Sequence, residues 1–187
     1  MRIISGKFGG RRFDIKVPPE TRPTTDFVKE IVFNVLQNII DFEGKIVYDL
    51  FAGTGAYGFE ALSRGAYFCC FVDKSPKACE IIKNISEKLG LEGKNYSIIK
   101  KDVLNFVRRH SESGLEKPDI IFIDAPYEKK IENNLLNFIK ENKIYKNEGL
   151  IIIEHSKMIN IMPLQGFEFI NKKEAGDSII DFIRCNL

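Results

Sequence analysis

The sequence has little of what marks a metalloprotein, a secreted protein or a membrane protein. Its 187 residues include four cysteines, without C-x-x-C spacing, and two histidines, so we expect no metal site. Cys69 and Cys70 are adjacent and would point to opposite faces of a strand, as reduced thiols in the core. No run approaches the roughly 20 apolar residues of a membrane span, and the first residues lack a signal-peptide pattern. These absences predict a cytoplasmic protein with no membrane partner.

A large net charge is also missing, because 28 basic residues are balanced by 26 acidic ones. The basic residues are unevenly placed: residues 1–22 carry six of them against two acidic residues, a net charge of +4. Short β-like runs flank Phe8-Gly9-Gly10, which predicts a hairpin or strand pair over residues 2–15 that extends from the main sheet. Such an arm is suited to contacting RNA phosphates, and a solvated arm without a ligand is the alternative interpretation. The candidate RNA-contacting residues of the arm are Arg2, Lys7, Arg11 and Arg12.

The apolar pattern along the chain alternates between strand-like and helix-like segments, as in a doubly wound α/β sheet. We predict a single domain over residues 1–187, with a basic β arm at 1–22 and a Rossmann-like core at 23–187. Residues 167–171 and 178–185 are too close for an intervening helix, so they predict an antiparallel hairpin. The other predicted strands are 46–50, 67–72, 95–100, 119–123 and 149–154, and the predicted helices are 26–40, 57–64, 75–89, 102–111 and 130–142.

A glycine-rich turn follows the first predicted strand. Gly53-x-Gly55-x-x-Gly58 matches a dinucleotide-binding fingerprint, in which the backbone approaches a ligand at a helix amino terminus. Asp49 stands at the end of the preceding strand, where its carboxylate would repel a pyrophosphate and attract a cationic sulfonium or ammonium group. Asp73, at the end of the next strand, would accept hydrogen bonds from ribose hydroxyls. The pattern therefore favours S-adenosylmethionine (AdoMet), although Asp73 alone fits a nicotinamide cofactor equally well.

Each of these residues also has a structural interpretation. The glycines can form a tight turn without a ligand, and Asp73 can favour the dipole of a helix that begins after a Ser75-Pro76 cap. Asp102 follows the third predicted strand, where it would either bind the adenine amine of the cofactor or cap the next helix. The candidate cofactor-binding residues are Asp49, Phe51, Ala52, Gly53, Thr54, Gly55, Asp73, Lys74, Asp102, Val103 and Asp124.

A second motif, Asp124-Ala125-Pro126-Tyr127, ends the predicted strand at 119–123. An exocyclic amine on a base is a poor nucleophile because its lone pair is delocalised into the ring. Hydrogen-bond acceptors on its two protons favour a pyramidal nitrogen, and the Asp124 carboxylate and Ala125 carbonyl would supply them. Pro126 would constrain the loop, and Tyr127 would stack on a base that has left its helix. These four are the candidate catalytic residues, and a strand-to-helix turn with a buried tyrosine is the structural alternative.

Both motifs, together with residues 21–26, resemble those of the RsmD-type 16S ribosomal RNA methyltransferases, which methylate the N2 amine of one guanine. Similar residues also stand at 1–6, 154–155 and 176–178, so the resemblance covers nearly the whole chain. One position departs from the family, whose tetrad usually reads Asp-Pro-Pro-Tyr. This chain has Ala125 in place of the first proline, so we expect a looser loop.

The resemblance implies a class I AdoMet-dependent methyltransferase fold, which is a Rossmann-like seven-stranded mixed sheet with helices on both faces, plus a short amino-terminal β-hairpin arm. The predicted carboxyl-terminal hairpin independently favours this sheet over a dinucleotide-binding one. The resemblance also implies AdoMet as the cofactor, and ribosomal RNA or an assembly intermediate of the small subunit as the partner. By resemblance alone, Arg22 and Thr24 would approach the methionine end of the cofactor or the RNA.

Three other functions stay open on the sequence. The tetrad recognises an amine and not a particular base, so an adenine-N6 methyltransferase acting on DNA or RNA is the nearest alternative. A non-catalytic RNA-binding or assembly factor with the same fold is the second, and a nicotinamide oxidoreductase is the third. We expect the protein to act as a monomer.

Overall fold

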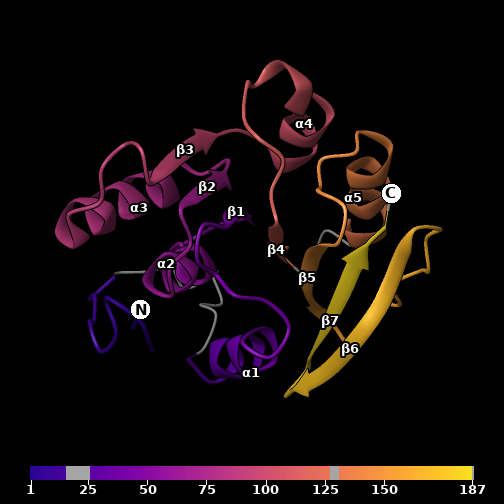
Figure 1. Ribbon diagram of the computed structural model, residues 1–187, viewed down its shortest axis with the longest axis horizontal. Helices are drawn as coiled ribbons and strands as arrows, with labels where there is room; N and C mark the ends of the chain where they lie inside the picture. Colours follow the sequence, from indigo (N-terminus) through magenta and orange to yellow (C-terminus); the bar gives the residue numbers. More distant parts are fainter. Residues whose placement is uncertain (16–25, 127–130, 187) are drawn as a thin grey trace.

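The polypeptide builds a seven-stranded mixed sheet with helices on both faces (Figure 1). This computed structural model describes residues 1–15, 26–126 and 131–186. The strands are β1 (Ile46–Leu50), β2 (Phe68–Asp73), β3 (Tyr96–Lys100), β4 (Ile120–Asp124), β5 (Gly149–Ser156), β6 (Phe167–Ala175) and β7 (Ser178–Cys185). Their order is β3-β2-β1-β4-β5-β7-β6, with β1 to β5 parallel and β7 antiparallel to both neighbours. The predicted seven-stranded mixed sheet with helices on both faces is confirmed.

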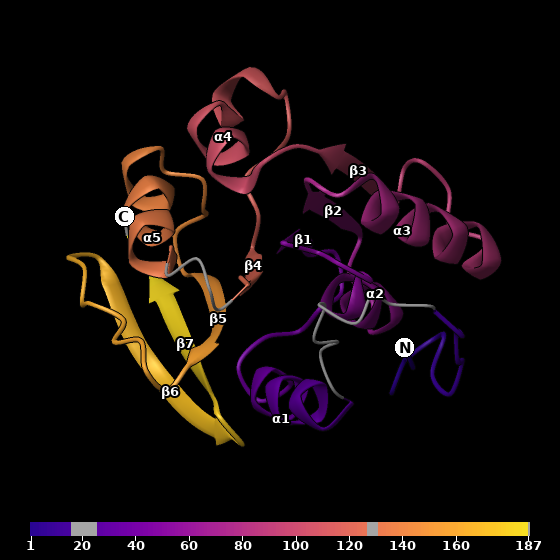
Figure 2. The same ribbon diagram turned by 180° about the vertical axis from the view of Figure 1, so that it is seen from behind.

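Two hydrophobic cores hold the helices against the two faces of the sheet. Figure 2 shows the ribbon from the opposite side to Figure 1. The first core includes residues of α1, α2 and α3, and the second includes residues of α4 and α5. Neighbouring strand residues alternate between the cores, since Val47 belongs to the first and Tyr48 to the second. The helices are α1 (Asp26–Leu36), α2 (Ala56–Ser63), α3 (Pro76–Leu89), α4 (Val103–Arg108) and α5 (Glu132–Glu141), with a short 3-10 helix, η1 (His110–Glu112), after α4.

Two predicted helices are shorter than their apolar periodicity indicated. The helix predicted at 26–40 ends at Leu36, because the Asn38 amide bonds to the Val35 carbonyl, three residues back instead of four, and the chain tightens into a turn. The helix predicted at 102–111 divides into α4 and η1. Periodicity alone does not reveal such a change in winding, since apolar side chains continue to contact the core through it.

The predicted carboxyl-terminal hairpin is confirmed, and it is longer than the sequence indicated. Its first strand was predicted to stop at residue 171, but β6 continues to Ala175 after an irregularity between Phe169 and Asn171. A bulge of this kind inserts an extra residue into one strand, which breaks the simple alternation of apolar and polar side chains. The alternation therefore under-estimates the length of β6.

The amino-terminal segment does not extend the main sheet, so that part of the prediction is wrong. It closes on itself through one antiparallel bridge between Arg2 and Arg12, and it packs on α2 (Figure 1). Ile3 and Phe8 belong to the first core, while two backbone amides donate to the fully buried Glu60 carboxylate at 2.7 and 3.1 Å. The two apolar anchors and the α2 carboxylate together explain why the segment folds back.

In residues 1–15, 26–126 and 131–186, every helix is too short or too polar to cross a membrane. The same described residues contain no group of three or more histidine, cysteine or acidic side chains arranged to hold a metal ion. The four cysteines are free thiols, and Cys69 and Cys70 are both buried. The division into an arm at 1–22 and a core at 23–187 stays a prediction.

Candidate active site

Four carboxylates lie at or near the carboxyl ends of neighbouring parallel strands. Asp73 and Asp124 are the last residues of β2 and β4, Asp49 precedes the last residue of β1, and Glu154 lies two residues before the end of β5. The strand order reverses between β1 and β4, and ligands of open α/β sheets bind in the crevice outside the strand ends at such a switch point. The sheet therefore collects these acidic side chains at the edge where a ligand is expected.

The turn after β1 is built from left-handed backbone conformations. The φ angles of Phe51, Gly53 and Gly55 are +62°, +54° and +76°. Positive φ angles are sterically unfavourable for residues that have a Cβ atom, whereas glycine adopts them readily. The Gly53 amide donates to the Asp73 carboxylate at 2.9 Å, which ties the turn to the end of β2. The turn is thus held in one shape by a residue that the sequence assigned to the same site.

Asp73 bonds to the turn after β1 and also to the start of α3. Its second carboxylate oxygen accepts the Ser75 amide at 2.8 Å, and the Ser75 hydroxyl caps α3 by accepting the Ala78 amide at 3.3 Å. The predicted Ser75-Pro76 cap is therefore confirmed. A carboxylate offers about four acceptor positions, more than these two amides use. The geometry is compatible with the predicted ribose contact.

Gly58 allows α2 to lie directly on the sheet. A Cβ atom at this position would come within 2.3 Å of the Phe71 ring and 2.6 Å of the Cys69 sulfur, both on β2. The Gly58 amide donates to the Asp49 carboxylate at 2.9 Å. The third glycine of the fingerprint thus acts in packing and in holding Asp49, and not by approaching a ligand.

Asp49 is a buried acid with other acids as neighbours. Its side chain is only 2% exposed, and burial raises its pKa well above the usual range, against the lowering effect of the Gly58 amide. The charges of Asp124 and Asp73 raise the pKa further. The electrostatic influence of both on Asp49 shows that the three carboxylates share one region, and such a cluster favours a positively charged ligand.

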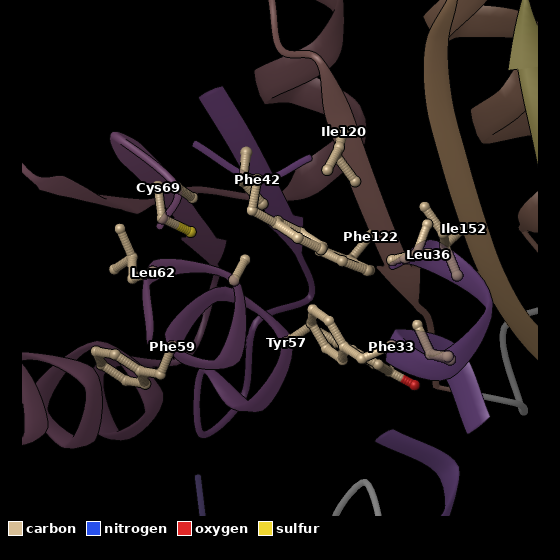
Figure 3. Close-up of a cluster of buried hydrophobic side chains, with 14 of the residues drawn as sticks. Phe33, Leu36, Phe42, Tyr57, Phe59, Leu62, Cys69, Ile120, Phe122 and Ile152 are labelled. Atoms are coloured by element: carbon tan, nitrogen blue, oxygen red, sulfur yellow. The ribbon is translucent and has the colours of Figure 1, made fainter. Parts of the chain in front are cut away.

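Tyr57 connects this cluster to β5. Its ring stacks on Phe122 with centroids 5.0 Å apart and planes inclined by 8° (Figure 3), and its hydroxyl donates to Glu154 at 3.0 Å. The Ser178 hydroxyl donates to the other Glu154 oxygen at 2.9 Å. Burial raises the pKa of Tyr57, as do the charges of Glu154, Asp124 and Asp49, so the phenol stays a hydrogen-bond donor. The sequence analysis assigned Tyr57 and Ser178 no role.

Comparison with known proteins places the chain in one family. The model of the family described as "Conserved hypothetical protein 95" matches residues 1–184. The chain belongs to this family. The Bacillus subtilis member YlbH is 35% identical over 94% of this chain and 93% of its own length. The "Ribosomal RNA small subunit methyltransferase D" of Buchnera aphidicola subsp. Acyrthosiphon pisum is 32% identical over 99% of this chain and 91% of its own.

The chain is also similar to solved structures. That of Escherichia coli yhhF superimposes with a TM-score of 0.83 and 25% identity, and the match covers 100% of this chain and 98% of the other. The predicted membership of the RsmD-type family is thus confirmed by sequence and by fold. The class I methyltransferase fold follows from this similarity and from the strand order.

Within this family fold, the predicted cofactor residues come from the ends of neighbouring strands. Those on the β1 turn and at the end of β2 are brought together by the Gly53–Asp73 bond. The end of β3 joins them, since the Lys101 amide donates to the Asp73 carbonyl at 3.1 Å. Asp102 caps α4 by accepting the Asn105 amide at 3.2 Å, which is the structural alternative, and its contact with adenine stays a prediction. Ala52, Gly55 and Val103 are buried, Phe51, Gly53 and Thr54 partly buried, and Lys74 exposed.

The structure describes only some of the predicted catalytic and RNA-binding residues. Ala125 is buried and Pro126 exposed, directly after β4. Lys7 and Arg11 flank the Phe8 ring at 5.4 and 5.5 Å from its centroid. Like Arg12, both are exposed, whereas Arg2 is partly buried. The residues that lie outside the described part of the chain are Arg22, Thr24 and Tyr127.

Proposed function

We propose that the protein transfers a methyl group from AdoMet to the exocyclic N2 amine of a guanine in small-subunit ribosomal RNA. The proposal is supported by membership of a family in which relatives from Buchnera aphidicola and Escherichia coli are named ribosomal RNA small subunit methyltransferase D. The observation that carries it is the convergence of Asp49, Asp73 and Asp124 at the switch point of the sheet.

The acidic cluster suits the proposed cofactor. When bound, AdoMet supplies an electrophilic methyl group on a positively charged sulfur, and it also carries an ammonium group. Asp49 and Asp124 provide negative charge for these groups, and Asp73 provides acceptors for the ribose hydroxyls. The pyrophosphate of a nicotinamide dinucleotide would instead meet three carboxylates. A solved structure of the same fold, with 22% identity and a TM-score of 0.68, is described as a complex with SAH, the demethylated form of this cofactor.

The end of β4 would hold the amine. The Asp124 carboxylate and the Ala125 carbonyl would each accept one amine proton, so that the nitrogen lone pair turns out of the plane of the base. Held in this way, the amine would present its lone pair to the methyl group that AdoMet would supply. The displaced amine proton passes to Asp124. Tyr127 is proposed to stack on the flipped base.

The arm would bind the RNA backbone. Lys7, Arg11 and Arg12 are exposed on a segment that α2 holds in place through Glu60 and Ser63, and Arg2, Arg22 and Thr24 are further proposed contacts. Cations at defined positions neutralise phosphates without reading sequence. Because the arm is docked on α2, which begins at the cofactor turn, RNA held by the arm would lie in a defined position relative to that turn. Action as a monomer in the cytoplasm remains a prediction.

A transfer assay tests the proposal. The purified protein is incubated with labelled AdoMet and, separately, with small-subunit particles, free ribosomal RNA and DNA, and the labelled nucleotide is identified by mass mapping. Label on a guanine amine of small-subunit RNA is expected, and Asp124→Asn should remove it even at AdoMet concentrations that saturate the variant. Asp41→Asn, at an exposed position before the start of β1, is the matched control.

Other results would identify the alternatives. Label on adenine, in DNA or RNA, would replace the guanine assignment by an adenine-N6 methyltransferase. Absence of transfer to every particle would support an assembly factor that retains the fold. Calorimetry with NAD and AdoMet tests the third alternative, because binding of NAD and not AdoMet would indicate an oxidoreductase.

A further inference from the structure

Glu154 lies beside Asp124 in the sheet. The two residues are register partners in the parallel pair β4–β5, so their backbones are about 4.8 Å apart and their side chains leave the same face of the sheet. Both charges act on the Tyr57 phenol, whose hydroxyl donates to Glu154. A base whose amine is held by Asp124 therefore has the Glu154 carboxylate one strand away.

The Glu154 carboxylate is held in one orientation. Tyr57 donates to one oxygen at 3.0 Å and Ser178 to the other at 2.9 Å, and the residue is 6% exposed. Both carboxylate oxygens therefore act as hydrogen-bond acceptors here. Glu154 is thus an oriented acceptor next to the proposed amine-binding residue.

Guanine and adenine differ at the atom beside their amine. In guanine the ring nitrogen N1 next to the N2 amine carries a proton and donates. In adenine the N1 next to the N6 amine has a lone pair and accepts. Enzymes that flip a base read this Watson–Crick edge by hydrogen bonds. An acceptor-only carboxylate beside the amine site attracts the first base and repels the second.

We infer that Glu154 accepts the N1–H of the target base while Asp124 holds the neighbouring amine, so that the β4–β5 pair selects guanine over adenine. This inference rests on the proposed function and deepens it, because it assigns base choice to one residue. A charge-assisted hydrogen bond of this kind changes the rate for a base that lacks the N1 proton by about 10- to 100-fold.

The test uses 2-aminopurine, which keeps the 2-amino group of guanine but has no N1 proton. The guanine identified by mass mapping is replaced by 2-aminopurine in a ligated ribosomal RNA that is reassembled into particles, and kcat/KM is measured for both bases. The wild-type protein should prefer guanine by about 10- to 100-fold. Glu154→Gln presents either an oxygen or an NH2 group, so its preference should fall close to 1. The matched control Glu141→Gln, on the exposed end of α5, should keep the wild-type ratio.

A structural role for Glu154 predicts a different result. Loss of the Tyr57 and Ser178 bonds alone would slow both bases equally in Glu154→Gln and lower its melting temperature, which would overturn the inference. Ser178→Ala removes one donor and keeps the charge, so it should retain the guanine preference. Equal rates of the wild-type protein on both bases would refute the inference without any variant, even if Glu154→Gln fails to fold. Wild-type inactivity on the guanine RNA would instead refute the proposed function, and this inference with it.

Discussion

Replacing Asp49 by asparagine should make the ligand-free protein more stable and the cofactor complex weaker. The asparagine side chain would keep the size of the aspartate and an oxygen that can accept the Gly58 amide, which now donates to Asp49 at 2.9 Å. It would remove an ionisable group whose charged form is disfavoured by burial and by the charges of Asp124 and Asp73. The opposite signs of the two effects separate a ligand-binding acid from a structural one.

The gain in stability and the loss of AdoMet affinity are both large enough to measure. Removal of an unfavourable charge from a functional site commonly raises the free energy of unfolding by about 0.5–2 kcal/mol. For a chain of this length, that raises the melting temperature by roughly 1–8 °C. The lost interaction with a cationic ligand is worth about 1.5–3 kcal/mol, so the dissociation constant of AdoMet should increase about 10- to 150-fold.

The pH dependence follows from the raised pKa of Asp49 in the folded, ligand-free protein. The folded state keeps its proton to higher pH than the unfolded state, so this group stabilises the fold below its unfolded pKa and loses that contribution as pH rises through the folded pKa. A cationic ligand binds the ionised form. The affinity for AdoMet should therefore increase with pH over the same window, with release of a proton.

Calorimetry and thermal unfolding provide the measurements. AdoMet is titrated into the wild-type protein, Asp49→Asn and the exposed control Asp41→Asn, in two buffers of different ionisation enthalpy that report the released proton. Melting temperatures without ligand are measured from acidic to neutral pH. Wild-type affinity in a folded Asp49→Asn protein would refute the view that the acidic cluster recognises positive charge.

The arm and the glycine of α2 allow two further predictions. Replacing Lys7, Arg11 and Arg12 by alanine should leave AdoMet affinity unchanged and reduce the salt dependence of RNA binding by about 0.7 per lost phosphate contact, or about 2 in total. An unchanged slope would show that RNA binds elsewhere. Gly58→Ala should lower the free energy of unfolding by about 1–3 kcal/mol, because its Cβ meets β2 within 2.3 Å, whereas Gly93→Ala, with open space around it, should be nearly neutral. Equal melting temperatures for these two variants would contradict the close packing of α2 on the sheet.

Local patterns in the sequence were sufficient for the succession of helices and strands along the chain and for part of the site. Apolar runs bounded by turns indicate strands, and residues that follow parallel strands must meet at one edge of the sheet. Asp49, Asp73 and Asp124 could be assigned to one crevice for that reason. Helix ends were less predictable, since the turn after Leu36 depends on hydrogen bonds that leave the apolar pattern unchanged.

The amino-terminal arm shows the limit of local reasoning. Its composition indicates a short basic hairpin, but its position depends on Glu60, a buried acid on α2 that accepts two of its amides. Glu60 lies among apolar helix residues. The sequence around it does not indicate that the amides it accepts belong to residues more than 50 positions away. The arm was therefore expected on the sheet and is found on a helix.

The sequence by itself determined the family, the order of helices and strands, and the acidic residues at three strand ends, because each depends on neighbouring residues and their spacing. Only the tertiary structure decided that Tyr57, Glu154 and Ser178 form one hydrogen-bonded group beside Asp124. That group requires the register of β4 against β5 and the packing of α2 on the sheet. Side-chain periodicity determines the face on which a residue lies, but not which residue of another segment stands opposite it.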